Sequence, residues 1–332
     1  ASGLDSPPEV IEIIRNKIKL EERAAQGEIF QINNQGKDFK FGIIHIPTFY
    51  FDYQSKNEGD DDYKSTTRDV QRLIKELEAQ GMEGLIIDLR KNTGGFLSEA
   101  VDLTGLFIKE GPVVQVRSAG NQLRIENDTD TSFLYEGPLV VCVDEFSASA
   151  SEIFAAAIQD YQRGIVIGAQ TYGKGTVQNV VDLNRVFPNY PEQLGQIKIT
   201  IAKFYRINGG STQHLGVIPN VVIPGRYNHE EVGESAKPNA LLWDRIDPLN
   251  FNVIDFKLPE IMSPIKDRHW ARMENIPEFK TYLESLEYFK EYRNKKEFSL
   301  NEEVRKKERE EAKLKKEENK ASADGFNSVL KN

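Results

Sequence analysis

The sequence predicts an α/β protein built from strand–helix–strand units. Three short apolar runs, GLIIDL at 84–89, PLVVCVD at 138–144 and GIVIG at 164–168, are typical of strands buried on both faces of a parallel sheet. Amphipathic segments with helical spacing separate these runs. Because a strand, a helix and a second strand in this order form a right-handed crossover, we expect a layered α/β sheet.

The N-terminal elements follow from apolar spacing and from punctuation by proline and glycine. The run KFGIIHIPTFY at 40–50 predicts a buried strand interrupted by Pro47. The preceding segment 8–27 fits strand spacing and helix spacing equally well. An amphipathic helix is expected within 60–81, because an acidic start precedes a one-sided apolar face and Gly81 ends the pattern.

The central part of the chain continues the alternation. Helices are expected at 97–111, with Gly111 as the stop, and at 149–164. A strand at 113–118 is expected to continue through 121–126. Further strands, with the glycines of INGGST marking a turn between the last two, are expected at 176–183, 196–207 and 217–224.

Composition divides the chain into three predicted regions, which are an N-terminal segment 1–38, an α/β core 39–228 and a helical C-terminal region 229–332. The net charge of −9 argues against nucleic acid or an anionic membrane as the main partner. No stretch approaches 18 apolar residues, so no membrane-spanning segment is predicted. The opening residues ASGLDSPP are typical of a processed end, from which an export signal could have been removed.

The segment GAQTYGKGTVQ at 168–178 invites two interpretations of Lys174. Its glycines and lysine nearly match a phosphate-binding loop, in which a helix must follow and its N-terminus faces the phosphates. Here a β-branched run follows instead, and Gly175 stands where the magnesium-binding hydroxyl belongs. The nucleotide interpretation is therefore disfavoured, which leaves a glycine turn with an exposed lysine or a different chemistry.

The segment FSASASEIF at 146–154 places Ser147, Ser149 and Ser151 between a buried strand and a helix. One of these serines is expected to cap the helix. The same junction also suits a nucleophile, because free N–H groups at a helix N-terminus stabilise an oxyanion. None of the four histidines lies in a motif that suggests a base. Lys174, flanked by glycines, can act as a base if burial lowers its pKa.

A third segment, NTGG at 92–95, follows the strand 84–89 and is expected at the same sheet edge. Alone it fits a plain turn, although its glycines could direct backbone N–H groups toward an oxyanion. Taken together, LIIDLRKNTGG, FSASASEIFAAAIQDY and TYGKGTVQ resemble the carboxy-terminal processing peptidases, most of all their bacterial periplasmic members. The segments FYRINGGSTQHLGVIPNVVIP and NALLWDRID add to the resemblance, which covers roughly residues 10–330.

The resemblance implies a serine endopeptidase with a serine–lysine dyad on a crotonase/Clp-protease-like α/β core, without metal or cofactor. It assigns Ser149 as nucleophile, Lys174 as general base and Gln178 as the residue that orients the lysine. On a strand, a spacing of four would place Lys174 and Gln178 on one face. The oxyanion hole implied by the resemblance comprises the N–H groups of Gly95 and Ala150, with Gly94 fixing the turn.

Three further polar residues match the family pattern and are expected in supporting roles. Glu152 in the first helical turn is adequately explained by the helix dipole. Asp160 is expected to hold local structure, since a carboxylate beside Lys174 would oppose the required fall in its pKa. Thr171 completes the set, and Ser147 and Ser151 are expected to cap or pack.

Members of this family carry a PDZ domain that captures substrate C-termini. Only segment 8–22 resembles the last strand of such a domain, so the chain is expected to be a fragment or a truncated member. The resemblance implies polypeptide substrates with apolar C-termini and a periplasmic or cell-envelope location in a bacterium. The charged C-terminal helices could dock an adaptor or a second copy. A crotonase-like acyl-CoA enzyme and a catalytically silent, substrate-binding fragment of a protease remain open as alternatives.

Overall fold

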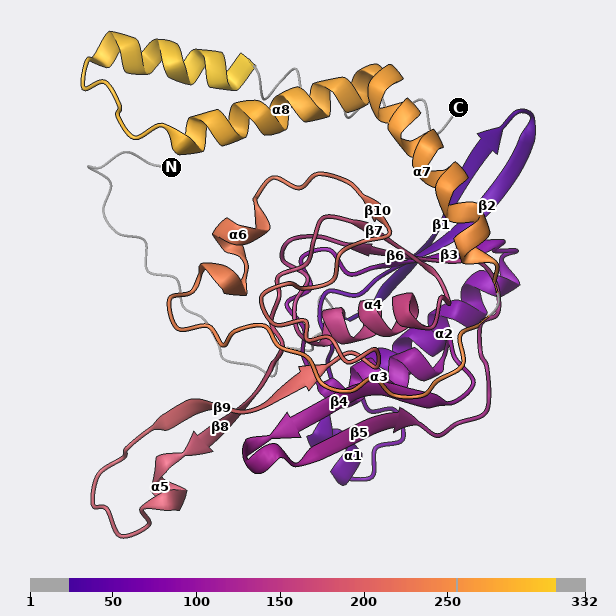
Figure 1. Ribbon diagram of the computed structural model, residues 1–332, viewed down its shortest axis with the longest axis vertical. Helices are drawn as coiled ribbons and strands as arrows, with labels where there is room; N and C mark the ends of the chain where they lie inside the picture. The colour runs from indigo at the N-terminus through magenta and orange to yellow at the C-terminus, as the bar shows by residue number, and fades with distance from the viewer. Residues whose placement is uncertain (1–23, 255, 315–332) are drawn as a thin grey trace, which may run out of the picture.

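A six-stranded sheet forms the centre of the molecule (Figure 1). The computed structural model describes residues 24–254 and 256–314. Neighbouring strands pair in parallel except at one edge, where β1 is antiparallel to β2. In spatial order the strands are β1 (Gln26–Asn34), β2 (Lys37–His45), β3 (Gly84–Asp88), β6 (Leu139–Val143), β7 (Ile165–Gly168) and β10 (Val221–Val222). The predicted α/β architecture is confirmed.

Three helices connect the parallel strands and build the core with them. These are α2 (Thr66–Ala79), α3 (Leu97–Gly105) and α4 (Ala150–Asp160). Helix α2 begins where the side chain of Ser65 accepts the Arg68 N–H, and its apolar face is buried as its spacing predicts. Short helical turns lie at α1 (Tyr53–Asn57), α5 (Leu183–Val186) and α6 (His229–Val232), with 3₁₀ turns at Ala119–Asn121 and Glu234–Ala236.

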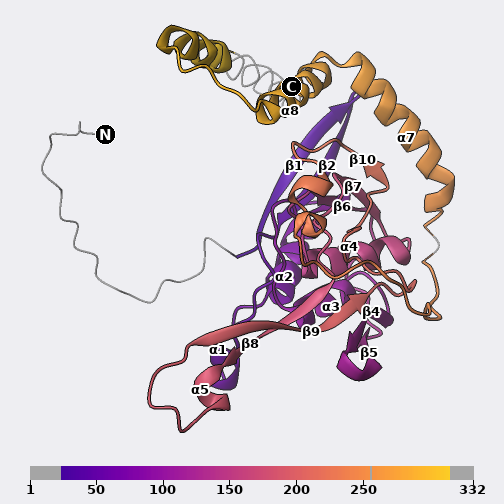
Figure 2. The ribbon, with the colours of Figure 1, turned by 60° about the vertical axis from the view of Figure 1, so that its left-hand side comes forward.

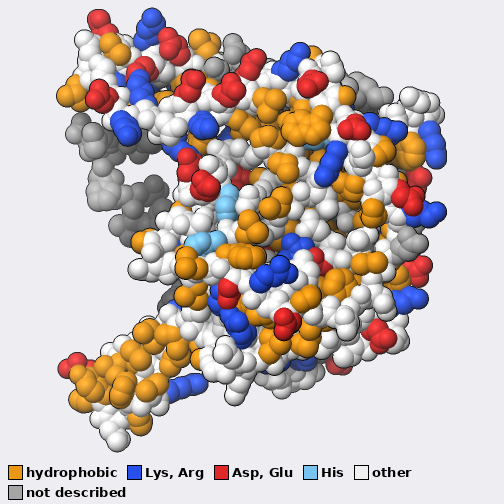
Figure 3. All heavy atoms as spheres, viewed as in Figure 1, with side chains coloured by type: hydrophobic (Ala, Val, Ile, Leu, Met, Phe, Trp, Pro, Cys, Tyr) orange, Lys and Arg blue, Asp and Glu red, His pale blue; other side chains and the backbone are white. Residues whose placement is uncertain are grey.

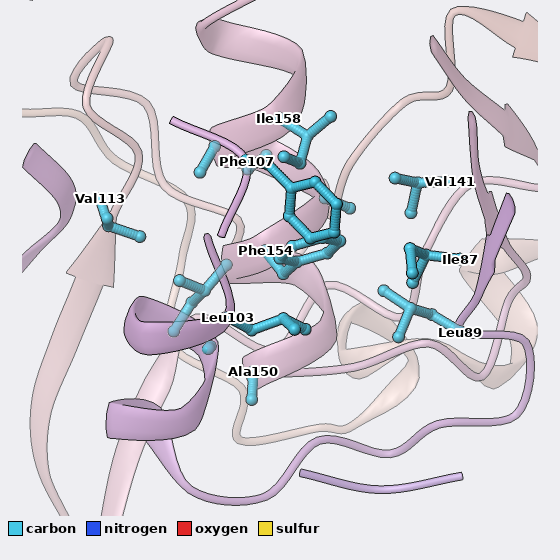
Figure 4. Packing of buried hydrophobic residues seen from close by; sticks show 14 of the residues in the cluster. Ile87, Leu89, Leu103, Phe107, Val113, Val141, Ala150, Phe154 and Ile158 are labelled. Carbon is cyan, nitrogen blue, oxygen red and sulfur yellow. The ribbon is translucent and has the colours of Figure 1, made fainter. Parts of the chain in front are cut away.

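Helix α4 is almost wholly enclosed by apolar side chains (Figure 4). Phe154 packs against Phe107 with ring centroids 5.8 Å apart. Val141 and Ile87, which are fully buried on the sheet, face the helix from the other side (Figure 4). Burial of one such side chain stabilises a fold by about 1.5–3 kcal/mol. The N-terminus of α4 is therefore held on a rigid scaffold.

A second, antiparallel sheet has the order β5-β4-β9-β8. Its strands are β4 (Gly111–Ser118), β5 (Leu123–Asp128), β8 (Thr176–Asp182) and β9 (Gln196–Tyr205). The expectation that the strand at 113–118 continues through 121–126 is wrong. Gly120 and Asn121 have positive φ values of 78° and 60°, which reverse the chain and return β5 antiparallel along β4.

Strands β8 and β9 extend away from the body as a two-stranded ribbon, opposite the C-terminal helices (Figures 1 and 2). The ribbon and its tip carry a patch of exposed apolar side chains (Figure 3). The members of this patch are Val180, Val186, Phe187, Tyr190, Ile197, Ile199 and Ile201. Ile197 and Ile199 share one face of β9, because side chains alternate along a strand.

The C-terminal region is helical, as predicted, with α7 (Leu258–Asn275), α8 (Pro277–Asn294) and a further helix at 302–314. It contacts the body beside the edge strand β10. The Tyr282 hydroxyl donates to Pro224 O at 2.5 Å, and the Phe289 ring lies 5.4 Å from the Tyr227 ring. Among the described helices, none has the length and apolar character needed to cross a membrane.

Two further strand predictions need correction, and one segment stays untested. Strand β1 has no counterpart among the expected elements, because half of its side chains are polar and it is secured by pairing with β2. The strand expected at 217–224 pairs only over Val221–Val222. Segment 8–22 lies outside the described residues, and the boundaries at 38 and 228 stay predictions.

Candidate active site

Three loops meet at the carboxyl edge of the parallel sheet, where they follow β3, β6 and β7. Asn92, which is fully buried, joins the first two loops. Its backbone carbonyl accepts the Ala148 N–H at 3.0 Å and the Ser151 hydroxyl at 2.9 Å. Its side-chain carbonyl accepts the Gly94 N–H at 2.8 Å. The NTGG turn and the serine segment are thus neighbours, as the parallel order of the strands predicts.

Ser149 occupies the N-cap position of α4 with φ 58° and ψ −112°. A non-glycine residue held at positive φ is strained by about 1–3 kcal/mol, a conformation found where a tight strand-to-helix turn exposes a nucleophile. Ser147 and Ser151 donate their hydroxyls to Leu89 O and Asn92 O, at 2.8 and 2.9 Å. The Ser149 hydroxyl donates to neither carbonyl, which sets it apart from these two packing residues.

Gly94 and Gly95 bring the NTGG backbone directly against Ser149. A Cβ on Gly94 would lie 2.8 Å from Ser149 Cβ, and one on Gly95 would lie 1.9 Å from Phe49 O. Both glycines also have positive φ values, 100° and 154°, so other residues are excluded on two grounds. Within residues 24–254 and 256–314, neither the Gly95 N–H nor the Ala150 N–H has a hydrogen-bond acceptor.

Glu152 links the serine segment, residues 146–151, to the lysine loop, residues 169–175. Its carboxylate accepts the Ser149 N–H at 2.7 Å, the Gly173 N–H at 2.7 Å and the Lys174 N–H at 2.9 Å. The Thr171 hydroxyl adds a fourth bond at 2.7 Å. Burial raises the pKa of Glu152 to about 7, although the four donors favour its charged form. The helix dipole therefore accounts for only a small part of what Glu152 does.

Lys174 has a half-buried side chain and a pKa below its ordinary value. Loss of hydration on burial is the main cause, and repulsion from Lys198 and Lys237 adds to it. Glu234 and Glu152 oppose this shift. The direction favours a neutral amine, which a general base requires. No hydrogen bond joins Ser149 Oγ to Lys174 Nζ within the described part of the chain.

Gln178 is placed differently from the expectation that four residues on a strand put it beside Lys174. Strand β8 begins only at Thr176, so Lys174 precedes it. The register with β9 also shifts between Val177 and Gln178, where Ile201 is left unpaired on β9. Gln178 is exposed and makes no side-chain hydrogen bond among the described residues. Its assigned role stays a prediction.

Asp160 and Thr171 have separate surroundings. Asp160 ends α4, eleven residues after Ser149, and its carboxylate accepts two bonds from the Arg206 guanidinium, at 3.0 and 2.5 Å. Because a helix rises 1.5 Å per residue, Asp160 lies roughly 16 Å along the helix from Ser149. Thr171 is fully buried, and its hydroxyl oxygen also accepts the Val217 N–H at 2.7 Å. Thr171 thus supports Glu152, whereas Asp160 fixes the far end of the helix.

Sequence reasoning did not identify Asn92 or Gln213 as site residues. Asn92 is the first residue of the predicted NTGG turn. The available signal was that asparagine side chains often accept backbone hydrogen bonds in turns. Gln213 contacts the lysine loop from 38 residues away, where its side-chain carbonyl accepts the Gly175 N–H at 2.8 Å. Local sequence patterns do not predict a contact between residues this far apart in the chain.

Comparisons with known proteins place these residues in a family. Residues 40–223 match peptidase family S41, and residues 227–331 match the C-terminal domain of tail specific protease. The tail-specific protease of Haemophilus influenzae is 42% identical over 305 residues, which cover 90% of this chain and 41% of that protein. The carboxy-terminal-processing protease of Bartonella bacilliformis is 33% identical over 183 residues, or 52% of this chain and 40% of the relative.

A solved structure named photosystem II D1 C-terminal processing protease aligns with a TM-score of 0.49 and 27% identity, over 63% of this chain and 50% of that chain. The chain thus spans less than half the length of either curated relative, at 41% and 40%. The S41 match covers more than half of the chain and includes all three loops of the candidate site. The chain belongs to peptidase family S41.

Proposed function

We propose that this chain is a serine endopeptidase in which Ser149 is the nucleophile and Lys174 the general base. One observation carries the proposal. The carboxylate of Glu152 accepts the backbone N–H groups of both Ser149 and Lys174, and so holds the two residues at one carboxyl group. The lowered pKa of Lys174 and the unpaired N–H groups beside Ser149 support the same assignment.

The chemistry is acyl transfer. Neutral Lys174 takes the Ser149 proton as the hydroxyl oxygen attacks a peptide carbonyl carbon. The negative charge that develops on the carbonyl oxygen is bound by the N–H groups of Gly95 and Ala150. The lysinium then protonates the leaving amine, and water hydrolyses the acyl-enzyme. Gln178 is proposed to orient the lysine once substrate is bound.

The substrates proposed are unfolded polypeptides, in particular those with apolar C-termini. Family membership and the tail-specific and C-terminal processing relatives support this choice. A periplasmic or cell-envelope location in a bacterium is proposed on the same basis. The C-terminal helices offer a surface for an adaptor or a second copy.

Cleavage of a labelled unfolded polypeptide such as casein tests the proposal. The wild-type chain is compared with Ser149→Ala and Lys174→Ala, each of which should lower kcat by several orders of magnitude. Equal cleavage by the three proteins would rule out the dyad. Turnover of an acyl-CoA that survives both substitutions would instead support a crotonase-like activity.

A further inference from the structure

The backbone of the lysine loop is fixed by two buried side chains. Glu152 accepts the N–H groups of Gly173 and Lys174. The next N–H, that of Gly175, is bonded at 2.8 Å by the side-chain carbonyl of Gln213. Lys174 is therefore clamped on both sides, by a carboxylate on α4 and by an amide on the segment 211–216.

The segment that carries Gln213 lies in close contact with the lysine loop. A Cβ on Gly175 would lie 2.6 Å from Gln213 N, so only glycine permits this approach. The His214 N–H donates to Gly173 O at 2.8 Å, which adds a backbone bond on the other side of Lys174. Gln213 itself is held by its own N–H, which donates to Ser211 Oγ at 3.0 Å.

The amide of Gln213 makes only part of the hydrogen bonds that it could make. The residue is fully buried, and its Nε2 has no partner among the described residues. Because Oε1 is engaged by Gly175, the remaining end of the amide carries only N–H donors, which do not stabilise a positive charge. A buried amide that leaves a donor unpaired destabilises the fold, so packing alone does not account for glutamine at this position.

We propose that Gln213 is a positioning residue, which holds Lys174 in place through the Gly175 N–H. The inference rests on the proposed function, because it assigns to Gln213 a role in the same dyad. Without this bond, the loop is free to move away from the segment 211–216, and the lysine side chain gains hydration. Small displacements of a catalytic group cost large factors in rate.

The charged groups that act on the Lys174 ammonium come from several elements. Glu152 on α4 and Glu234 in the turn after α6 favour the charged form, whereas Lys198 on β9 and Lys237 after that turn disfavour it. Replacing Gln213 by Met changes none of these charges. A shift in the lysine titration of that variant then reports that the Lys174 side chain has changed its surroundings.

The test compares Gln213→Met, which removes the acceptor and nearly keeps the volume, with Gln213→Glu, which restores it. Gln115→Met is the matched control, because Gln115 is equally buried and donates only to Arg206 O and Asp247 O, both 3.1 Å away. We expect Gln213→Met to lower kcat at least tenfold with KM within twofold of wild type. Gln213→Glu should recover most of the loss at the plateau of its pH profile, and Gln115→Met should keep wild-type kcat.

A second measurement does not depend on peptidase activity. The Lys174 pKa, read by ¹³C NMR in the Ser149→Ala background, should rise in Gln213→Met and stay unchanged in Gln115→Met. An unshifted pKa in Gln213→Met overturns the inference even if the chain proves inactive. If wild type cleaves and Ser149→Ala does not, while Gln213→Met keeps full kcat, the positioning role fails and the dyad stands.

Discussion

At the scale of single residues, the candidate site depends on close contacts that leave no room for substitution. Gly94 is the clearest case, since it has a φ of 100° and a missing Cβ that would lie 2.8 Å from both Ala148 O and Ser149 Cβ. Any side chain there must push the serine segment away from the NTGG turn. The separation between the proposed nucleophile and the proposed oxyanion donors then changes, and in the proposed mechanism the rate depends on that separation.

Gly94→Ala is therefore expected to lower kcat by about 10²-fold or more. The control is Gly120→Ala, because Gly120 also has a positive φ, 78°, but has no atom within 4 Å of its missing Cβ. The control variant introduces backbone strain of about 1–2 kcal/mol without a steric clash, and it should retain wild-type kcat. Equal kcat values for the two variants would show that the contact with Ser149 is unimportant.

Glu152 makes a prediction about stability and pH. Its pKa rises from an ordinary 4.5 to about 7 on folding, mainly because burial disfavours the charge. Between these values the folded state holds a proton that the unfolded state has lost, so stability falls as pH rises. For a pKa of about 7 in the folded state and 4.5 in the unfolded state, the free energy of unfolding falls by about 3 kcal/mol, and the fall is complete above pH 7.

Denaturant unfolding of wild type and Glu152→Gln from pH 4.5 to 7.5 measures this effect. The glutamine variant does not titrate at this position, so the wild-type free energy of unfolding minus that of the variant should fall by up to about 3 kcal/mol. A difference that stays constant across this range would mean that Glu152 keeps its ordinary pKa in the folded chain.

At the scale of elements, helix α4 connects the candidate site to the rest of the core. Its first residue follows Ser149, the proposed nucleophile, and its last residue, Asp160, accepts bonds from Arg206 and Asn208. The Asp160 side chain is 6% exposed and that of Arg206 16%, so the ion pair is shielded from water. Removing one partner leaves a buried charge unpaired.

Asp160→Ala should accordingly lower the free energy of unfolding by about 3–5 kcal/mol. Below its melting temperature the variant should keep kcat within a fewfold of wild type, since Asp160 contacts none of the dyad residues. Glu76→Ala, which breaks an exposed pair with Arg72, should cost less than about 1 kcal/mol. A large loss of kcat in fully folded Asp160→Ala would instead show that Asp160 contributes to the activity and not only to stability.

The elements also show what the sequence could and could not predict. The buried runs at 84–89, 138–144 and 164–168 predicted neighbouring parallel strands, because strands covered on both faces must be apolar throughout. From that order followed the meeting of the NTGG turn with Ser149. The contacts of Glu152 with residues 171–174 and of Gln213 with Gly175 were not predictable, because they depend on how distant loops pack. The bulge at Ile201, opposite Val177 and Gln178, is likewise set by the pairing of β9 with β8.

At the scale of the whole molecule, the helical C-terminal region contacts the body beside β10 through both α7 and α8, and His269 and Met273 of α7 are buried. The contact includes the Tyr282 bond to Pro224 O, the Phe289–Tyr227 ring pair and an ion pair between Arg293 and Glu231. The α8 part of this contact consists of a few side chains, and contacts of this kind open more readily than those of the core.

The double variant Tyr282→Phe with Phe289→Ala should therefore release α8 from the body. Limited trypsin digestion is expected to cleave within 258–314 several times faster in this variant, while hydrolysis of a short peptide continues. Tyr292→Ala is the control, because Tyr292 is 47% exposed and its ring pairs with Tyr288 and Phe298. Equal digestion of all three proteins would mean that other contacts hold the helices.

The central claim is that neutral Lys174 activates Ser149, and phosphonylation of Ser149 by a fluorophosphonate, with loss of fluoride, tests it most directly. The rate is followed across pH in wild type and Lys174→Ala, with the adduct located by mass spectrometry. The dyad predicts that the adduct forms on Ser149. Its rate of formation in wild type should rise with pH, with an apparent pKa below the ordinary lysine value of 10.5. In Lys174→Ala the rate should be about 10²–10⁴-fold lower. Equal rates in both proteins at every pH, or an adduct on another residue, would contradict it.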